Sequence, residues 1–180
     1  MIQESAREEW WEWAENQDGQ NKVRKDNTMK FSVIAGAWII KDGKVLLLKQ
    51  RPKDYQHQPN KWGPPAGHGE DNESLEETLR REVKEETNLD IKIEGLVQSA
   101  IVRTDKLYAV AMYLASTKNT KNLKIDPDEH QDYAWATLND IVRGKYEFRV
   151  PMLKSVAIRA FKGIKSSQDS FLLLNSFDEI

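Results

Sequence analysis

The sequence predicts an α/β domain in which helices pack on a central β-sheet. Two apolar runs of strand character, FSVIAGAWII and KVLLLKQ, flank an Asp-Gly pair, which is a strong signal for a β-hairpin. Two more such runs, IKIEGLVQSAIVR and LYAVAMYLAS, lie further along the chain. Between the two pairs is a highly charged segment in which Leu75, Leu79 and Val83 recur every four residues, as on one stripe of an α-helix.

The first elements follow in chain order. The hairpin turn is expected at Asp42-Gly43, because a type I′ turn requires positive φ at both central residues. A loop rich in Pro, Asn and Gly is expected over residues 51–67, and the charged helix from Ser74 to Thr87. The second pair of strands is expected to turn at residues 104–106.

The C-terminal part predicts a short strand and two helices. The strand is DYAWATL, whose Thr137 is expected to cap a short helix through Asp140 to Val142. Pro151 is expected in the first turn of a last helix. The inward face of that helix is expected to carry four apolar residues, Leu153, Val156, Ala157 and Ala160.

The domain itself is expected to occupy residues 29–165, with an extension and linker at 1–28 and a tail at 166–180. The extension has a helix-like stretch that carries Trp10, Trp11 and Trp13. Tryptophans on a peripheral segment should not stay in water. They are expected either to dock on the core of their own chain or to form the interface of a homodimer.

Composition excludes several classes of protein. The chain of 180 residues has no cysteine, which excludes disulfides, thiolate metal sites and a cysteine nucleophile. A net charge of -2 does not suggest a nucleic-acid groove. No apolar run approaches the roughly 18 residues needed to span a bilayer, and the acidic start MIQESAREEWWEW lacks the apolar region of a signal peptide. We therefore expect a cytoplasmic protein without a membrane partner.

The charged helix places three carboxylates, those of Glu82, Glu85 and Glu86, on one side. Carboxylates packed in this way repel one another and raise each other's pKa. One interpretation is a solvated helix face with ion pairs such as Glu77 with Arg81. The other is a site for a hard divalent cation, since Mg²⁺ takes oxygen ligands from a few carboxylates, waters and substrate phosphates.

The whole pattern from Gly67 to Leu89, GHGEDNESLEETLRREVKEETNL, resembles the Nudix box. The box residues matched are Gly67, Glu73, Arg81, Glu82, Val83, Glu85, Glu86 and Leu89. The departure is Asn88, where the family usually has Gly; Asn is the next-best residue for the left-handed conformation that ends a helix. The preceding KWGPPAGHGE and the hairpin AGAWIIKDGKVLLLKQR are also similar to the family. The resemblance covers about residues 31–142 and implies a Nudix-type α/β/α sandwich with a mixed central β-sheet.

The resemblance also implies an activity, the hydrolysis of a nucleoside diphosphate linked to another group by water attack on phosphorus. It implies Mg²⁺, or Mn²⁺, held by Glu82, Glu86, Glu85 and the backbone carbonyl of Gly67, with Glu85 alternatively orienting the attacking water. Arg81 and Glu73 are expected to pair across the loop and the helix and to fix these carboxylates.

The general base often lies outside the box in this family, in a loop before a late strand. DPDEHQDYAW supplies Glu129, the preferred candidate as base or additional metal ligand; Asp126, Asp128, His130 and the box residue His68 are weaker candidates. Substrate anchoring requires cations for phosphates and an aromatic ring for a base. The candidates are Arg51, Lys61 and Trp62, with Lys49 and Arg103 behind them.

Several functions compete. A small-molecule nucleotide, such as a nucleoside triphosphate, is the preferred substrate class. PPAGHGE resembles enzymes that act on ADP-ribose or nucleotide sugars, but no Pro occurs between Leu89 and Pro127, where those enzymes usually carry one. A non-catalytic regulatory module would be expected to lose box carboxylates, and this chain keeps them. An isopentenyl diphosphate isomerase relies on a cysteine, and processing of RNA ends is disfavoured by the weak basic character.

Overall fold

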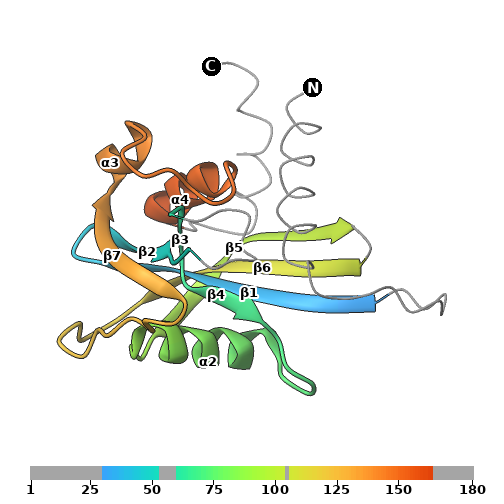
Figure 1. Cartoon of the computed structure of the whole chain (residues 1–180). Helices are drawn as coiled ribbons and strands as arrows, with labels where there is room; N and C mark the ends of the chain where they lie inside the picture. The colour runs from blue at the N-terminus through green and yellow to red at the C-terminus, as the bar shows by residue number, and fades with distance from the viewer. Residues whose placement is uncertain (1–29, 53–59, 104–105, 164–180) are drawn as a thin grey trace, which may run out of the picture.

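The computed structural model describes residues 30–52, 60–103 and 106–163 of the chain. The tryptophan-bearing extension, the tail at 166–180 and part of the turn expected at 104–106 lie outside these described residues. The described part forms an α/β layered domain, as the sequence predicts (Figure 1).

A mixed sheet of seven strands organises this domain. Its main path runs β3-β2-β1-β6-β5, with β4 paired to β1 and β7 paired to β2. The strands are β1 (Lys30–Lys41), β2 (Lys44–Gln50), β3 (Trp62–Gly63), β4 (Ala66–His68), β5 (Lys92–Arg103), β6 (Lys106–Ser116) and β7 (His130–Thr137).

The first hairpin forms because its turn residues tolerate positive φ. Asp42 has φ 48° and Gly43 has φ 70°, which is the pair of left-handed conformations that a type I′ turn requires. Beyond the turn β2 pairs with β1 only at Lys44 and Val45, while β7 runs antiparallel along the opposite edge of β2. The other side of β1 pairs in parallel with β6 from Lys30 to Ile40.

The charged helix α2 (Leu75–Thr87) begins and ends where its sequence predicts. The Ser74 side chain accepts from the Glu77 backbone N–H and the Glu77 side chain accepts from that of Ser74, so a capping box closes the first turn. Asn88 ends the helix with φ 56°, in the left-handed conformation expected of the usual glycine. The apolar stripe of Leu79 and Val83 is fully buried.

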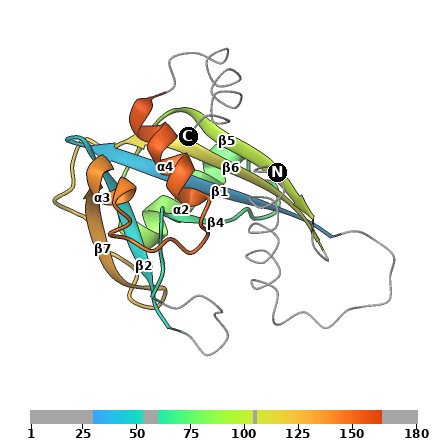
Figure 2. The same cartoon turned by 90° about the horizontal axis from the view of Figure 1, so that it is seen from above.

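Helices cover the two faces of the sheet. α2 packs on one face, where Leu79 and Val83 meet Ala35, Ala37 and Ile39 of β1. The other face is covered by α4 (Leu153–Lys162), with the short α3 (Leu138–Val142) beside it (Figures 1 and 2). The expected inward residues of α4 are all buried, and the Thr137 cap of α3 is confirmed.

Two local expectations are corrected. Residues 51–67 are not all loop, because β3 and β4 form there as two- and three-residue strands against β2 and β1. Pro151 precedes the last helix instead of lying in its first turn; α4 starts at Leu153 with Met152 as its N-cap. Within the described ranges, none of the helices has both the length and the apolar character required to cross a membrane.

Candidate active site

Arg81, on α2, is the centre of a charged network. Its Nε lies 2.7 Å from Glu73 Oε1 and its Nη2 lies 3.0 Å from Glu73 Oε2, so the two side chains form the pair expected across loop and helix. Glu73 also accepts from the Thr78 hydroxyl and the Glu70 backbone N–H. The Arg81 hydrogen bonds, followed by these other donors, hold the pKa of Glu73 at about 2.

The same guanidinium reaches two further box carboxylates. Its Nη1 lies 2.9 Å from Glu82 Oε1 and 3.0 Å from Glu85 Oε2. Its Nη2 also donates to the backbone carbonyl of His68, 2.7 Å away. Glu77 is absent from this network because it serves the capping box. Arg81 therefore ties the loop before α2 to the acidic side of the helix.

Glu82 lies directly over Gly67. A Cβ added to Gly67 would be 2.1 Å from the carboxyl carbon of Glu82, so no other residue fits at position 67 without moving that carboxyl. Burial raises the pKa of Glu82 to about 7, although Arg81 acts in the opposite direction. The neighbouring Glu86 and Glu85 add smaller upward contributions to this pKa.

Glu86 is held from two sides. Its Oε2 accepts from the backbone N–H of Ala66 in β4 at 2.9 Å, and its Oε1 lies 3.0 Å from Nε2 of His130 at the start of β7. Both the Glu86 and the His130 side chains are 5% exposed. The buried carboxylate is thus fixed by β4, the element before α2, and by β7, which lies much further along the chain.

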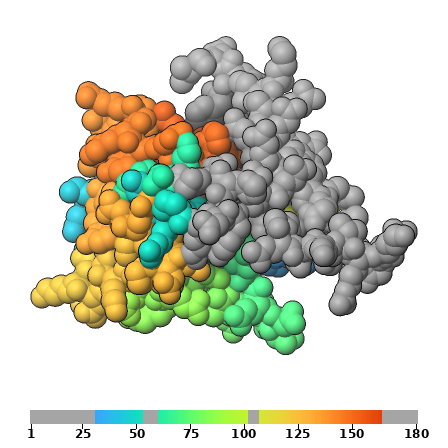
Figure 3. Space-filling view, in the orientation of Figure 1, coloured from blue at the N-terminus to red at the C-terminus, as the bar shows by residue number. Residues whose placement is uncertain are grey.

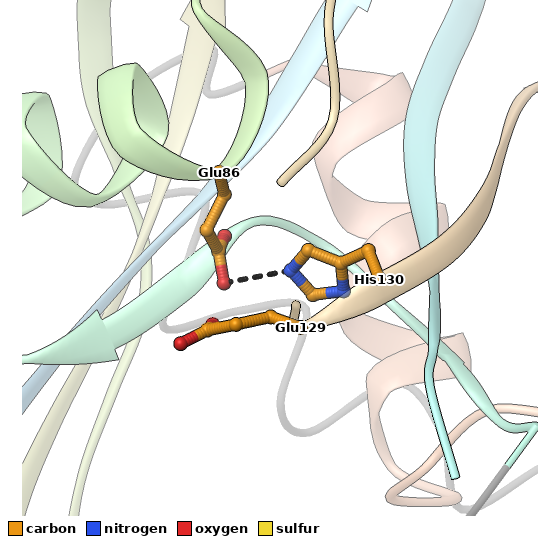
Figure 4. Close-up of side chains that lie close together, drawn as sticks. All are labelled: Glu86, Glu129 and His130. Carbon is orange, nitrogen blue, oxygen red and sulfur yellow. Dashed lines mark hydrogen bonds and ion pairs between the residues drawn. The ribbon is translucent and has the colours of Figure 1, made fainter. Parts of the chain in front are cut away.

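Glu86, Glu129 and His130 converge (Figure 4). Within the described residues they are the group of acidic and imidazole side chains whose ligand atoms all lie within 4.8 Å of one another. Backbone hydrogen bonds explain the convergence: Asp126 N–H donates to the Glu86 carbonyl at the end of α2, and Arg51 N–H donates to the Glu129 carbonyl. The loop that carries Glu129 is therefore fastened to both α2 and β2.

The donors present fit a divalent metal ion. Carboxylate oxygens suit Mg²⁺ and Mn²⁺, and an imidazole nitrogen is accepted by Mn²⁺ more readily than by Mg²⁺. Glu82, with its raised pKa, adds a carboxylate that gains from a nearby cation. Glu85 is less suited to ligate the metal ion, because its side chain is 59% exposed and forms an ion pair with Arg81.

The expected substrate-binding residues have other partners in this structure. Lys61 forms an ion pair with Glu147, and Arg51 donates to the carbonyl of Pro127, which supports the Glu129 loop. Trp62 is half-buried, with its ring edge-on to Tyr146 at 5.0 Å between centroids. Lys49 Nζ lies 5.8 Å from the centre of the Trp62 ring. The side chain of Arg103 lies outside the described residues.

The sequence reasoning missed one charged residue near this group. Arg149, in the chain between α3 and α4, is half-buried and interacts electrostatically with Glu86 and Glu129. The available signal was a single cation between the apolar residues Phe148 and Val150, both of which are buried. His130, a weak candidate from the sequence, is a member of the group.

Fold and site together define an α/β layered domain with a carboxylate and histidine group that could hold a metal ion. The chain matches the NUDIX domain over residues 30–156. The chain belongs to the Nudix family, and the expectation of a hydrolase acting on phosphoric anhydride bonds is confirmed at the level of family and enzyme class.

Relatives agree with this assignment. Nucleoside triphosphatase NudI of Escherichia coli is 28% identical over 142 residues, which cover 73% of this chain and 98% of the relative. A nudix hydrolase 1 of Caenorhabditis elegans is 34% identical over 109 residues, but the match spans only 28% of that longer protein and 60% of this chain. The solved structure of a NUDIX hydrolase from Nitrosomonas europaea is similar with a TM-score of 0.62 and 25% identity, over 74% of this chain and 90% of that one.

Proposed function

We propose that the protein is a Mg²⁺-dependent pyrophosphohydrolase that converts a nucleoside triphosphate, or a related nucleotide, and water into a nucleoside monophosphate and pyrophosphate. The water oxygen forms a bond to the α- or the β-phosphorus, the bond from that phosphorus to the oxygen bridging the two breaks, and the products are the same in both cases. The observation that supports this proposal best is the convergence of Glu86, Glu129 and His130 at the end of the box helix. NudI, by its name a nucleoside triphosphatase, matches this chain over 98% of the length of NudI.

The metal ligands proposed are Glu82, Glu86 and the carbonyl of Gly67, with Glu85 as a more exposed contributor, while His130 orients Glu86. A bound divalent cation would neutralise phosphate charge and lower the pKa of a coordinated water. The protein holds these donors in place before any ligand arrives, since Glu86 is fixed by Ala66 and His130. Such fixed donors need little reorganisation during the reaction.

Arg81 positions the box carboxylates and Glu129 takes the proton of the attacking water in this proposal. Arg81 suits its role because one guanidinium bonds Glu73, Glu82 and Glu85. Glu129 suits its role because its side chain is exposed, beside the buried Glu86, while its backbone is held by Arg51. An exposed carboxylate can accept a proton from water and return it to solvent.

Two alternative functions rank below hydrolysis of a nucleoside triphosphate. The Pro64-Pro65-Ala66-Gly67 stretch ahead of the box favours ADP-ribose or a nucleotide sugar as the substrate. A nucleotide-binding module without turnover is disfavoured by the retention of every box carboxylate and by their fixed arrangement.

The test is a panel of nucleoside triphosphates, ADP-ribose, nucleotide sugars and dinucleoside polyphosphates, incubated with the protein with and without Mg²⁺ or Mn²⁺. Phosphate release is measured after coupling to a pyrophosphatase and, separately, to a phosphatase. Glu86→Gln is the test variant, and Glu76→Gln, an exposed glutamate on the same helix, is the matched control. Reaction in ¹⁸O-labelled water shows by mass spectrometry which product receives the water oxygen.

The expected result is metal-dependent release of pyrophosphate from triphosphates, with the label in one of the two products identifying the phosphorus attacked. Glu86→Gln should lose about a hundredfold or more of the activity, in the range typical of catalytic-site changes, while Glu76→Gln keeps it. Turnover confined to ADP-ribose or a nucleotide sugar would contradict the triphosphate as substrate and favour that other substrate class. Nucleotide binding without turnover of any compound would contradict the enzyme and favour the module.

A further inference from the structure

Arg149 is held against the short strand β3 by its backbone. Its N–H donates to the carbonyl of Trp62 at 2.9 Å, and the N–H of Trp62 donates to the carbonyl of Glu147 at 2.8 Å. Figure 3 shows the two segments in contact, with the teal chain around β3 against the orange chain that leads to α4. The side chain of Arg149 therefore leaves a fixed point beside the chain that leads into β4.

The guanidinium passes close over Gly63 toward the active-site group. A Cβ added to Gly63 would be 2.6 Å from Nε of Arg149, so the absence of a side chain there makes room for it. Nη2 donates to the carbonyl of Pro64 at 3.1 Å. Two residues further along, the N–H of Ala66 donates to Glu86, so the guanidinium lies along the segment that reaches the buried carboxylate.

Arg149 approaches the acidic group without pairing with it. Glu86 and Glu129 both act on it electrostatically, yet among the described residues no carboxylate lies within the 4.0 Å of an ion pair. A guanidinium has five N–H donors, and the one side-chain hydrogen bond found here uses one of them. In the described chain, the side-chain nitrogens that are fully buried and have no partner belong to Trp38 and His130. The Arg149 nitrogens without a partner are not among them, so these nitrogens are in part accessible to solvent.

This arrangement leaves a guanidinium on one side and carboxylates on the other, separated by more than contact distance. A half-buried cation is costly to desolvate and is usually compensated by an anion. A phosphate fits between such groups, because a guanidinium can bind two of its oxygens with parallel N–H donors. The hydrogen bond to Pro64 would satisfy a purely structural role, but it does not supply the anion that the charge of Arg149 requires.

We propose that Arg149 binds a phosphate group of the substrate, which lies between its guanidinium and the group of Glu86, Glu129 and His130. The proposal rests on the function proposed above and adds the residue that grips the pyrophosphate part of the substrate, a role that the sequence analysis gave to Arg51 and Lys61. Those two cations are engaged with Pro127 and Glu147.

The test measures equilibrium binding of inorganic pyrophosphate and, separately, of a nucleoside that lacks phosphates, by calorimetry on the full chain in the presence of Mg²⁺. The variants are Arg149→Met, which removes the charge at similar length, and Arg149→Lys, which keeps the charge but not the planar fork. Arg143→Met, an exposed arginine in the same part of the chain, is the matched control. Thermal melting of each variant shows whether it is folded.

Arg149→Met should weaken pyrophosphate binding about tenfold to a hundredfold, since hydrogen bonds to charged groups are the stronger ones. Arg149→Lys should weaken it severalfold even if Arg149→Met proves unfolded, and nucleoside binding should not change in either variant. Arg143→Met should bind as the wild type does. Unchanged pyrophosphate affinity in Arg149→Lys and Arg149→Met, or a loss confined to the nucleoside, would overturn the proposal.

The experiments distinguish a failure of the proposed hydrolysis from a failure of the proposed phosphate binding by Arg149. Pyrophosphate binding that depends on Arg149, without turnover of any nucleotide, would support the inference and contradict the proposed hydrolysis. Turnover of a triphosphate with the Michaelis constant and pyrophosphate affinity unchanged in Arg149→Met would do the reverse.

Discussion

Nε2 of His130 lies 3.0 Å from Oε1 of Glu86, and both side chains are buried. A carboxylate can only accept, so in the tautomer that bonds to a Glu86 carboxylate it is Nε2 that donates. The other ring nitrogen, Nδ1, is then a buried acceptor without a partner in the described chain. The histidine therefore orients the carboxylate at the cost of one unsatisfied group, which is typical of a position kept for function.

Removing this donor should loosen the metal site. For His130→Leu we expect metal affinity to fall about tenfold to a hundredfold, as for other residues that orient metal ligands. His130→Gln, whose amide can donate to Glu86, should retain more of the affinity. Titration with Mn²⁺ followed by electron paramagnetic resonance measures both constants without requiring turnover. Wild-type affinity in His130→Leu would show that the contact has no part in metal binding.

Stability of the metal-free protein should depend on pH through Glu82. Burial raises its pKa from 4.5 to about 7, so the folded state binds the proton more tightly than the unfolded state. The resulting stabilisation is present below pH 4.5 and is lost as the pH rises to 7, by roughly 3 kcal/mol at most. Glu82→Gln should remove this decline in chemical denaturation measured from pH 4.5 to 8.

Glu73 provides a control of opposite sign. Its pKa is lowered to about 2, so its contribution is present above pH 4.5 and is lost as the pH falls toward 2. Glu73→Gln should change the acid side of the profile and leave the window of Glu82 intact. Parallel profiles for wild type and Glu82→Gln would contradict the assignment to Glu82.

Gly67 should tolerate no side chain while Glu82 occupies its present position. Gly67→Ala places a Cβ within 2.1 Å of the Glu82 carboxyl carbon, so one of them must move. We expect a loss of about 1 kcal/mol in unfolding free energy, at the low end for overpacking, because the group that must move is the end of a flexible side chain. A double-mutant cycle with Glu82→Ala checks the cause, because the cost of Gly67→Ala should shrink when the carboxyl is absent. Equal costs in both backgrounds would place the strain elsewhere.

Asn88 should be harder to replace by alanine than by glycine. Its φ of 56° favours glycine or asparagine, and its Nδ2 donates to the carbonyl of Asn122 at 3.0 Å. Asn88→Ala loses both advantages and should cost about 1–2 kcal/mol. Asn88→Gly regains the backbone freedom but loses the hydrogen bond, so its unfolding free energy should stay near that of the wild type. A stable Asn88→Ala would mean that neither feature matters.

The elements that the sequence predicted well are those determined by nearby residues. Asp42-Gly43 fixes its turn through the φ angles that these residues tolerate, and Ser74 with Glu77 fixes the start of α2 through hydrogen bonds three residues apart. Arg81 and Glu73 are also close in sequence, since they are eight residues apart and only the first two turns of α2 lie between them. The short β3 and β4 could not be predicted in this way, because their few residues are defined by their partner strands.

The composition of the site was only partly predictable for the same reason. The box contains Glu82, Glu85 and Glu86, but their spacing does not show that Arg81 engages the first two while Glu86 turns toward β7. His130 and Arg149 reach the site through long-range pairings, β7 with β2 and the chain at Phe148 with Trp62. No period or spacing in the sequence reports such pairings.

The parallel pairing of β1 with β6 has a consequence for how the protein is made. α2, with all of its box residues, lies inside the stretch of chain that this pairing closes, and non-local closure of this kind is slow because its entropy cost comes before its contacts. Synthesis proceeds from the N-terminus, so the emerging chain carries the complete box before it carries Glu129 and His130. At that stage the box is present but the site is incomplete, because Glu129 and His130 are missing. The site is complete once β7 has paired with β2.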